Sequence, residues 1–261
     1  MPLANGVFFL GISVTFKAQI HTMRIHLISG PRNISTALMY SFAQRADMSV
    51  VDEPFYGYFL EVSGRQHPGR EDVLATMPTD AQEVIAKTIL ANYPTPNVFF
   101  KNMAHHLLGE VDLAFTTECT NIFLIRDPKK LIASLALVID KPELLDTGLA
   151  LSAKLFWQMK EQSGKTPVVI NSGELLKNPE KYLAAVCEGI GIPFDKAMLS
   201  WPAGPRPEDG IWAKYWYTSV HESTGFAPQR SEERELPQEL IPLYEEALPH
   251  YEFLNTYAIG V

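Results

Sequence analysis

The sequence has 261 residues, of which 46% are hydrophobic and 20% charged, and its formal net charge is −8. This length predicts one domain with a sizeable core, or one domain with an appendage. The acidic balance argues against a general nucleic-acid binder and against a membrane-surface binder. No apolar run approaches the ~18 residues that a transmembrane helix needs. We therefore expect neither nucleic acid nor a membrane as a partner, and an anionic ligand would have to be held by local cations.

The first 22 residues lack the basic region and the cleavage site of a signal peptide. Met23 stands directly before the first clear strand, so residues 1–22 are either native or an extension from an upstream start. We expect a single domain over residues 23–261. Cys119 and Cys187 have no CxxC spacing, which favours buried, reduced thiols and a cytoplasmic location.

Short β-rich apolar runs with little alternation are typical of strands that are buried on both faces of a parallel sheet. In chain order they predict strands at residues 25–28, 48–52, 97–101, 121–126 and 167–171. Helical patterns occupy residues 33–46, 80–93, 128–139, 147–164 and 178–191, and one or two amphipathic helices close the chain at 236–258. This alternation predicts an α/β fold with three layers, a parallel sheet flanked by helices.

Each predicted strand ends in polar or charged residues. Ligands of such folds bind beyond the carboxyl ends of the strands. Polar strand ends are also common as simple solvation, but Glu, Lys and Arg would meet here on one edge. The residues concerned are Ser29, Asp52-Glu53, Lys101-Asn102, Arg126-Asp127 and Asn171-Ser172.

The stretch LISGPRNISTALMYSF, residues 27–42, leads from the first strand through a Ser-Gly-Pro turn into a helix. A nucleotide-binding P-loop would read GxxxxGK[ST], whereas this loop has Arg32 and no Gly-Lys pair. A helix N-terminus binds anions through its unpaired N–H groups. We expect a phosphate or sulfate to be wrapped by Gly30, Pro31, Arg32, Asn33, Ile34, Ser35 and Thr36.

A second stretch, IFLIRDPKKLIAS, places Arg126 at the end of a strand and Ser134 eight residues later in the following helix. Both side chains would then reach one phosphate at the strand's carboxyl end. The alternative is an ion pair of Arg126 with Asp127 and a serine that caps or lines a helix.

Together, the two stretches resemble the sulfotransferases that use 3'-phosphoadenosine 5'-phosphosulfate (PAPS). In that family a strand–loop–helix motif, with Arg or Lys followed by Ser/Thr-Thr, holds the 5'-phosphosulfate, and an Arg-x7-Ser motif holds the 3'-phosphate. Here GPRNIST, with Arg32, Ser35 and Thr36, corresponds to the first motif, and RDPKKLIAS, with Arg126 and Ser134, corresponds to the second. The loop is most similar to the version in tyrosylprotein sulfotransferases, where a catalytic glutamate follows the arginine by 21 residues. Counting 21 residues from Arg32 gives Glu53.

The resemblance implies a P-loop nucleoside-triphosphate-hydrolase-like fold and sulfuryl transfer from PAPS to a small-molecule acceptor. It also implies 3',5'-ADP as the product and no required metal. Arg32, Lys101 and the loop N–H groups would stabilise the leaving charge, and Glu53 would be the base. Lys101 has a second interpretation as a structural ion-pair partner of Glu53.

The sequence departs from the family in two places. The Lys-Thr-His stretch of many members reads FFKNMAHH here, so Lys101 matches but the first histidine, His105, falls two positions late. His105 is the alternative base, and we expect at most one of the adjacent His105 and His106 to be catalytic, because neighbours on a helix or strand cannot both face one pocket. A histidine that lines or caps a helix is the other interpretation. The family's RKGxxGDWK stretch is missing, and Arg230 is our candidate to replace it from its charge and position.

Residues 201–235 are rich in Pro and Gly yet carry several aromatic residues, which favours an ordered loop that covers something. Its rings either stack on adenine, wall the acceptor site or fasten the loop to the sheet. Two other functions compete with sulfuryl transfer. They are a P-loop-type kinase that uses ATP-Mg and a non-catalytic adenosine-phosphate binder. The sequence does not determine the acceptor or the oligomeric state.

Overall fold

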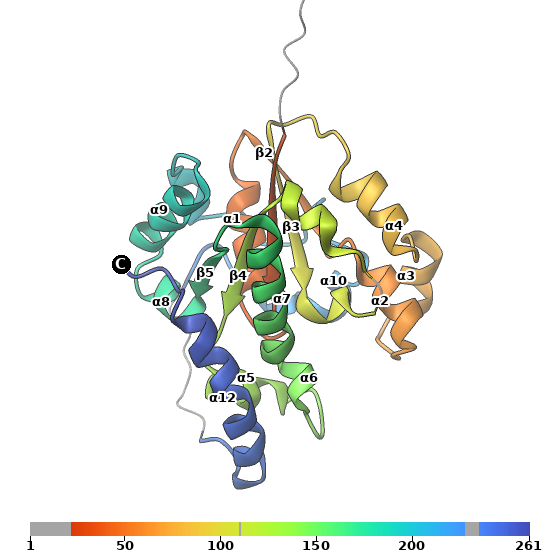
Figure 1. Ribbon diagram of the computed structural model, residues 1–261, viewed down its shortest axis with the longest axis vertical. Coiled ribbons are helices and arrows are strands. Elements are labelled where there is room, and N and C mark those ends of the chain that lie inside the picture. The colour runs from red at the N-terminus through yellow and green to blue at the C-terminus, as the bar shows by residue number, and fades with distance from the viewer. Residues whose placement is uncertain (1–21, 110, 228–234) are drawn as a thin grey trace, which may run out of the picture.

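The computed structural model describes residues 22–109, 111–227 and 235–261 (Figure 1). The extension predicted at residues 1–22 lies outside the described residues except for Thr22, and so does the predicted nucleotide ligand Arg230. Within the described part of the chain, no helix combines the length and the apolar character that crossing a membrane requires.

The five predicted strands are all present and form one parallel sheet in the order β2-β3-β1-β4-β5. They are β1 (Met23–Ser29), β2 (Met48–Asp52), β3 (Asn97–Met103), β4 (Thr120–Ile125) and β5 (Val168–Asn171). Because all strands run the same way, their polar carboxyl ends share one edge of the sheet. Asp52 lies directly opposite Lys101 in the register of β2 and β3.

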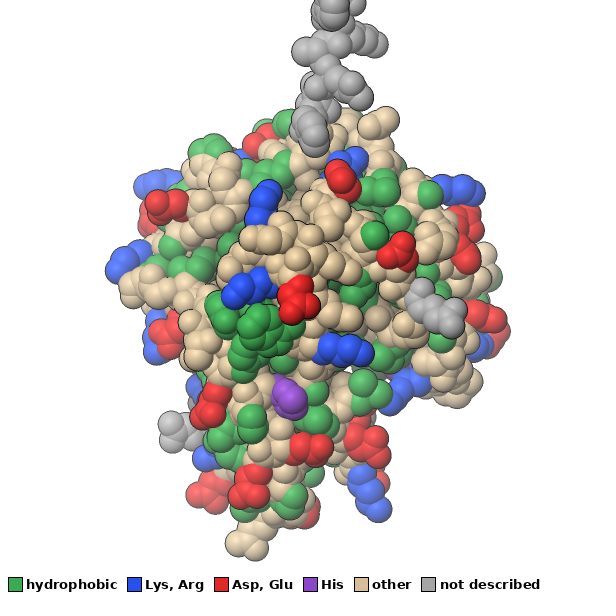
Figure 2. Space-filling model, in the orientation of Figure 1, with side chains coloured by type: hydrophobic (Ala, Val, Ile, Leu, Met, Phe, Trp, Pro, Cys, Tyr) green, Lys and Arg blue, Asp and Glu red, His purple; other side chains and the backbone are tan. Residues whose placement is uncertain are grey.

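Helices cover both faces of the sheet, as the predicted three-layer fold requires. On one face α7 and α12 pack with α4 over a core that includes Phe123 and Phe156 (Figure 1). On the other face α1 and α9 pack over a core that includes Ile25 and Leu183. Figure 2 shows hydrophobic side chains gathered on the outer side of α7 and α12, where Trp157 stacks on Phe253 with 5.5 Å between ring centroids.

The described helices have the following bounds. The α-helices are α1 (Ser35–Ala43), α2 (Tyr56–Ser63), α3 (Arg70–Thr76), α4 (Ala81–Val84), α5 (Pro128–Leu135), α6 (Leu144–Thr147), α7 (Leu149–Ser163), α8 (Ser172–Lys177), α9 (Pro179–Ile190), α10 (Ala213–Trp216), α11 (Thr218–His221) and α12 (Ile241–Asn255). The other helical segments are the π-helix η1 (Ile85–Ile89) and the 3-10 turns η2 (Ala104–Leu107), η3 (Leu113–Glu118), η4 (Lys196–Leu199) and η5 (Gln238–Leu240).

The main helices fall within the predicted ranges, although several are shorter. The pattern at 80–93 is α4 continued by a π-helix, and the pattern at 128–139 ends as a helix at Leu135. The sequence pattern predicts no helix between residues 54 and 79, yet α2 and α3 lie there. Helices of seven or eight residues contain only two turns, which is too short for a 3.6-residue period to stand out.

Residues 201–227 form an ordered segment, which we call the covering loop. It contains α10 and α11, and a β-bridge between Ser200 and Gly225 holds its two ends together. Trp201, Trp212 and Tyr217 are buried. These three rings fasten the loop to the rest of the protein, whereas Tyr215 and Trp216 are exposed.

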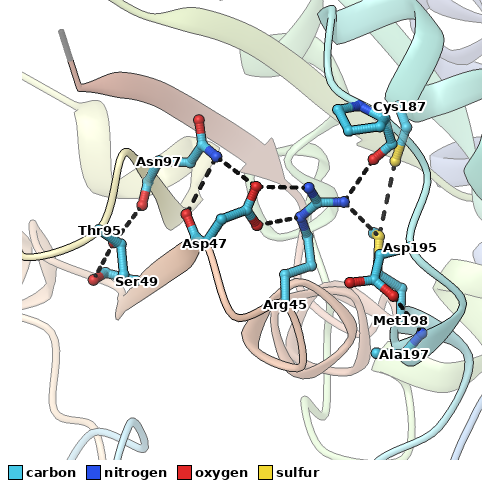
Figure 3. Close-up of polar contacts among 10 residues, drawn as sticks. Arg45, Asp47, Ser49, Thr95, Asn97, Cys187, Asp195, Ala197 and Met198 are labelled. Atoms are coloured by element: carbon cyan, nitrogen blue, oxygen red, sulfur yellow. Dashed lines mark hydrogen bonds and ion pairs between the residues drawn. The ribbon is translucent and has the colours of Figure 1, made fainter. Parts of the chain in front are cut away.

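Arg45 fastens the amino edge of the sheet, opposite the edge with the polar strand ends (Figure 3). Its guanidinium group makes two bonds of 2.9 Å to the carboxylate of Asp47 and one of 2.7 Å to the carbonyl of Pro193. Asn97 of β3 also donates to Asp47, at 3.1 Å. The charge of Arg45 thus joins the end of α1, the start of two strands and the segment before η4.

Candidate active site

A cleft with a volume of about 1390 Å³ opens at the carboxyl edge of the sheet. Its walls come from the loop after β1, from α2, from the 3-10 turn η2 after β3, from α5 and α6, and from the covering loop. These segments are far apart in the sequence and meet here because every one of them follows or covers the end of a parallel strand.

The loop after β1 forms one end of the cleft, which residues 31–37 line. Helix α1 begins at Ser35, and within the described residues no side chain caps this start and no acidic residue lies in its first turn. Gly30 instead packs against α6, since a Cβ atom there would come within 2.4 Å of the carbonyl oxygen of Thr147. Asn33 also has a structural contact, a 3.1 Å bond from its amide to the carbonyl of Leu124 in β4.

The two basic motifs meet at this loop. The Nε atom of Arg32 donates to the hydroxyl oxygen of Ser134 at 3.1 Å, and the guanidinium of Arg126 donates to the backbone carbonyl of Arg32. Burial and then the nearby charge of Arg32 lower the pKa of Arg126 from its ordinary value. The side chain of Asp127 accepts from the Lys130 N–H group at 3.1 Å and so caps α5. Two guanidinium groups thus lie together in the cleft, which is suited to an anion.

Glu53 lies at the end of β2, within a buried ionic cluster. The ammonium of Lys101 lies 2.8 Å from a carboxylate oxygen of Asp52 and 2.8 Å from one of Glu53. It also donates to the hydroxyl of Thr36 at 3.1 Å and to the hydroxyl of Tyr217. The Lys101 side chain is fully buried, whereas Glu53 lines the cleft. Lys101 therefore makes the ion pair with Glu53 that the sequence suggested as its structural role.

Charge and burial compete within this cluster. Burial lowers the pKa of Lys101, but the charges of Asp52 and Glu53 outweigh burial and raise that pKa above its ordinary value. Burial raises the pKa of Asp52, against the opposing charge of Lys101. The ammonium therefore stays charged, and it is shared between two carboxylates.

His105 and His106 both line the cleft, which adjacent residues of a strand or an α-helix would not do. The reason is that they lie on a 3-10 turn, where neither the alternation of a strand nor the period of an α-helix applies. His106 is the nearer to the predicted base, with 4.0 Å between its Nδ1 atom and a carboxylate oxygen of Glu53. Burial lowers the pKa of both histidines well below the ordinary value, so both are neutral near pH 7.

Aromatic rings wall the cleft beside Glu53. The His106 ring packs against the rings of both Tyr56 and Phe59, with centroid distances of 5.0 and 4.8 Å. Trp216 and Tyr217 of the covering loop line the same cleft, whereas the buried Trp212 packs beneath it. The covering loop thus both fastens itself to the protein and walls the site. Tyr217 is one of the rings that the sequence suggested as a wall of the site, but its contacts with Asp52 and Glu53 could not be foreseen, because more than 160 residues separate them.

The described residues bring together no group of three or more His, Cys, Asp and Glu side chains that would hold a metal ion. Fold and site define an α/β protein of the P-loop-like class, with a cationic loop after the first strand. The chain belongs to the sulfotransferase family, since the family model described as "Sulfotransferase domain" matches residues 23–258.

Solved structures with the same fold are sulfotransferases. The sulfotransferase from Alicyclobacillus acidocaldarius aligns with a TM-score of 0.54 over 90% of this chain and 96% of its own, at 15% identity. The sulfotransferase domain of the olefin synthase from Synechococcus PCC 7002 aligns with a TM-score of 0.51 over 86% of this chain and 94% of its own, also at 15% identity. These two similarities show the fold alone.

Curated relatives are found in Arabidopsis thaliana. The branched-chain-amino-acid aminotransferase-like proteins 1 and 2 are 38% and 35% identical to this chain over 233 residues. The match covers 89% of this chain but only 42% and 41% of the relatives. The chain therefore spans less than half the length of these proteins, and their names describe much longer molecules.

Proposed function

We propose that this protein transfers a sulfuryl group from PAPS to a hydroxyl or amine of a small-molecule acceptor, with Glu53 as the base. The observation that carries the proposal is the meeting of the two basic motifs. Arg32 bonds to Ser134 at 3.1 Å, and Arg126 bonds to the backbone of Arg32, in a cleft that Glu53 also lines. The Arg-x7-Ser motif favours PAPS over ATP, because ATP has no 3'-phosphate for it to contact.

The residues around the loop fit a doubly phosphorylated adenosine. The uncapped first turn of α1 offers N–H donors to the 5' end, together with Arg32 and the hydroxyls of Ser35 and Thr36. Arg126 and Ser134 would hold the 3'-phosphate. Gly30, which packs against α6, and Asn33, whose amide bonds to β4, also fix the shape of this loop.

When bound, PAPS supplies a sulfuryl group that is already activated and whose transfer leaves negative charge on a phosphate oxygen. Arg32 and the first-turn N–H groups of α1 would lie against that charge. Lys101 would act from behind them through Thr36, whose hydroxyl it contacts at 3.1 Å. Glu53 would accept the proton of the acceptor. His106, rather than His105, is the alternative base, since it lies nearer to Glu53.

The cleft has room for donor and acceptor together. Its volume of about 1390 Å³ exceeds the range of roughly 300–1,000 Å³ that is usual for a single ligand. The rings of Tyr56, Phe59 and Trp216 line the part of the cleft that would receive the acceptor. An alcohol, a phenol, a sugar hydroxyl or an amine would suit Glu53. We further propose one domain over residues 23–261 and, from the free thiols of Cys119 and Cys187, a reducing cytoplasm as the location.

Thermal unfolding with 3',5'-ADP, AMP and ATP-Mg tests the donor. At a ligand concentration of a hundred times Kd, the free energy of unfolding rises by about 2.7 kcal/mol. We expect a clear shift with 3',5'-ADP and little with ATP-Mg, while the reverse result would indicate a kinase. Mass spectrometry of acceptor classes incubated with PAPS then tests transfer. Binding of 3',5'-ADP without any transfer would indicate a non-catalytic binder.

A further inference from the structure

Asp52, the residue before Glu53, makes more polar contacts than a residue at the end of a strand needs. Asp52 shares the ammonium of Lys101 with Glu53, at 2.8 Å from each. The side chains of Asp52 and Lys101 are almost fully buried, at 1% and 0% exposure, and that of Glu53 is 9% exposed. Two carboxylates and one ammonium leave a buried excess of one negative charge, which is costly unless further donors stabilise it.

The covering loop supplies these donors. The Tyr217 hydroxyl donates to Asp52 at 2.7 Å, and the backbone N–H of Gly210 donates to the same oxygen at 3.2 Å. The Tyr217 hydroxyl also lies 3.4 Å from Glu53, and it accepts a bond from the ring N–H of Trp212 at 3.2 Å. The seating of the covering loop is thereby connected directly to the ionic cluster that contains the base.

Other groups face the same cluster from every side. They are Tyr40 on α1, Tyr56 on α2, His67 before α3 and His106 on η2. Burial lowers the pKa of His67 and His106, and it raises the pKa of Tyr40 and Tyr56. These four groups are therefore neutral near pH 7. Asp209 of the covering loop lies behind Tyr40, whose hydroxyl donates to it, and its other carboxylate oxygen lies 2.9 Å from His221. The charge in direct contact with Lys101 is that of Asp52 and Glu53.

We propose that Asp52 and Tyr217 are positioning residues that hold the base Glu53 and set the charge of its buried cluster through their shared contacts with Lys101. This inference rests on the proposed function. Asp52 draws part of the ammonium's charge away from Glu53, so Lys101 does not pair with the base alone. Tyr217 donates to the cluster from the covering loop, so the excess negative charge is stabilised only while that loop is seated. The three charged groups titrate as one unit.

Two substitutions should shift the titration of the cluster in opposite directions. A loss of structure alone would not produce opposite shifts. Tyr217→Phe keeps the ring but removes a donor from the carboxylates, so the cluster binds a proton at higher pH. Asp52→Asn leaves one carboxylate on Lys101, so the cluster binds its proton at lower pH. A hydrogen bond to a charged group is worth about one pH unit or more. We therefore expect the acidic limb of the kcat/KM profile to move by about one pH unit, upward in Tyr217→Phe and downward in Asp52→Asn.

The control is Tyr182→Phe. Tyr182 is a buried tyrosine whose hydroxyl accepts a 2.9 Å bond from the backbone of Asn171, away from the cluster. We expect Tyr182→Phe to be less stable than wild type and to leave the acidic limb of the kcat/KM profile unchanged. The same titration is followed without turnover, from the side-chain carboxyl carbons of ¹³C-labelled protein as the pH is changed. The inference therefore remains testable if the protein transfers no sulfuryl group.

The inference holds if Tyr217→Phe moves both the acidic limb of the kcat/KM profile and the carboxyl titration to higher pH, and Asp52→Asn moves both to lower pH. The inference is overturned if the titration of Tyr217→Phe is the same as that of wild type and of the control Tyr182→Phe. It is also overturned if Tyr217→Phe and Asp52→Asn shift the titration in the same direction. Should Asp52→Asn fail to fold, the comparison of Tyr217→Phe with Tyr182→Phe decides. The proposed function fails separately, if wild type neither binds 3',5'-ADP nor transfers a sulfuryl group from PAPS.

Discussion

Arg32 and Glu53 have an unusual backbone conformation. Among the described residues, they are the two non-glycine residues with a φ angle in the left-handed region, at 53° and 42°. This conformation is uncommon for side chains with a Cβ atom and costs roughly 1–3 kcal/mol at each position. Backbone strain therefore coincides with the two residues that the sequence resemblance names as anion ligand and base. Their roles remain predictions, but the coincidence favours a functional reason for the strain.

Glu53→Gln tests the base. The substitution keeps the size of the side chain and removes the proton acceptor, so we expect sulfuryl transfer to fall by roughly 10²- to 10⁴-fold. Affinity for 3',5'-ADP, measured by calorimetry, should stay near that of wild type. Glu61→Gln, on the exposed side of α2, is the matched control and should retain full activity. Turnover near the wild-type rate in Glu53→Gln would transfer the role of base to His106.

Arg126→Ala tests the second basic motif. If Arg126 pairs with the 3'-phosphate, its loss should weaken 3',5'-ADP by about 10- to 100-fold, the usual worth of a charged hydrogen bond. Affinity for 5'-AMP should change much less, because that nucleotide lacks the 3'-phosphate. Equal weakening of both nucleotides would contradict the prediction. It would mean that Arg126 acts only through its bond to the Arg32 carbonyl, as a support of the loop.

At the scale of elements, the cleft depends on helices that hold the sheet from the face opposite α1. Helix α7 follows α6 directly and packs its inner side against the sheet, with Phe156 fully buried against Phe123 at 5.6 Å between ring centroids. The backbone of α6 in turn lies against Gly30 at the start of the anion loop. Packing of α7 therefore helps to fix the loop at the carboxyl edge.

Phe156→Ala tests this packing. Removal of a fully buried phenyl ring leaves a cavity, so we expect the free energy of unfolding to fall by about 3–5 kcal/mol in urea titrations. Lys154→Ala, on the exposed side of the same helix, is the control and should change stability by less than about 0.5 kcal/mol. A loss in Phe156→Ala no larger than in the control would show that α7 does not hold the core.

At the scale of the whole molecule, a chain with a net charge of −8 carries a group of basic side chains in its cleft. Arg32, Arg126, Lys129 and Lys130 all line it. Carboxylates dominate the molecule as a whole, whereas these four side chains gather where parallel strands and the N-termini of α1 and α5 meet. A phosphorylated ligand is therefore attracted at short range, and its binding should weaken with added salt.

Buried histidines make the stability of the whole fold depend on pH. His26 on β1 is fully buried, bonds to Asn121 at 3.1 Å, and packs edge-on against Phe115. Burial, opposed by the bond to Asn121, lowers the pKa of His26 from 6.5 to about 4. The unfolded chain then binds more protons than the folded one between these pH values, so stability is complete above about pH 6.5 and falls toward pH 4.

His26→Gln tests this dependence. A shift of this size is worth at most about 3 kcal/mol of unfolding free energy, because each pH unit contributes about 1.4 kcal/mol. We expect wild type to lose more stability than His26→Gln between pH 7 and pH 4.5 in urea titrations. His250→Gln, on the partly exposed surface of α12, should keep the wild-type slope. Equal slopes in wild type and His26→Gln would contradict the assignment.

The sequence alone determined the sheet and the two basic motifs. Strands buried on both faces need continuous apolar runs, so all five could be located from hydrophobicity. The GPRNIST and Arg-x7-Ser stretches are local, because a strand, a turn and a helix start fix their geometry over a few residues. For the same reason the 21-residue step from Arg32 to Glu53 could be counted, since it spans one helix and one strand.

Only the tertiary structure decided which side chains meet. The contacts of Asp52 with Tyr217 and of Arg32 with Ser134 join positions more than 100 residues apart, and no local periodicity encodes them. The 3-10 turn that turns His106 toward Glu53, and the packing that seats the covering loop, likewise depend on neighbours from other segments. Local patterns specify elements because backbone geometry repeats along the chain. A site is specified only when packing of the elements brings their ends together.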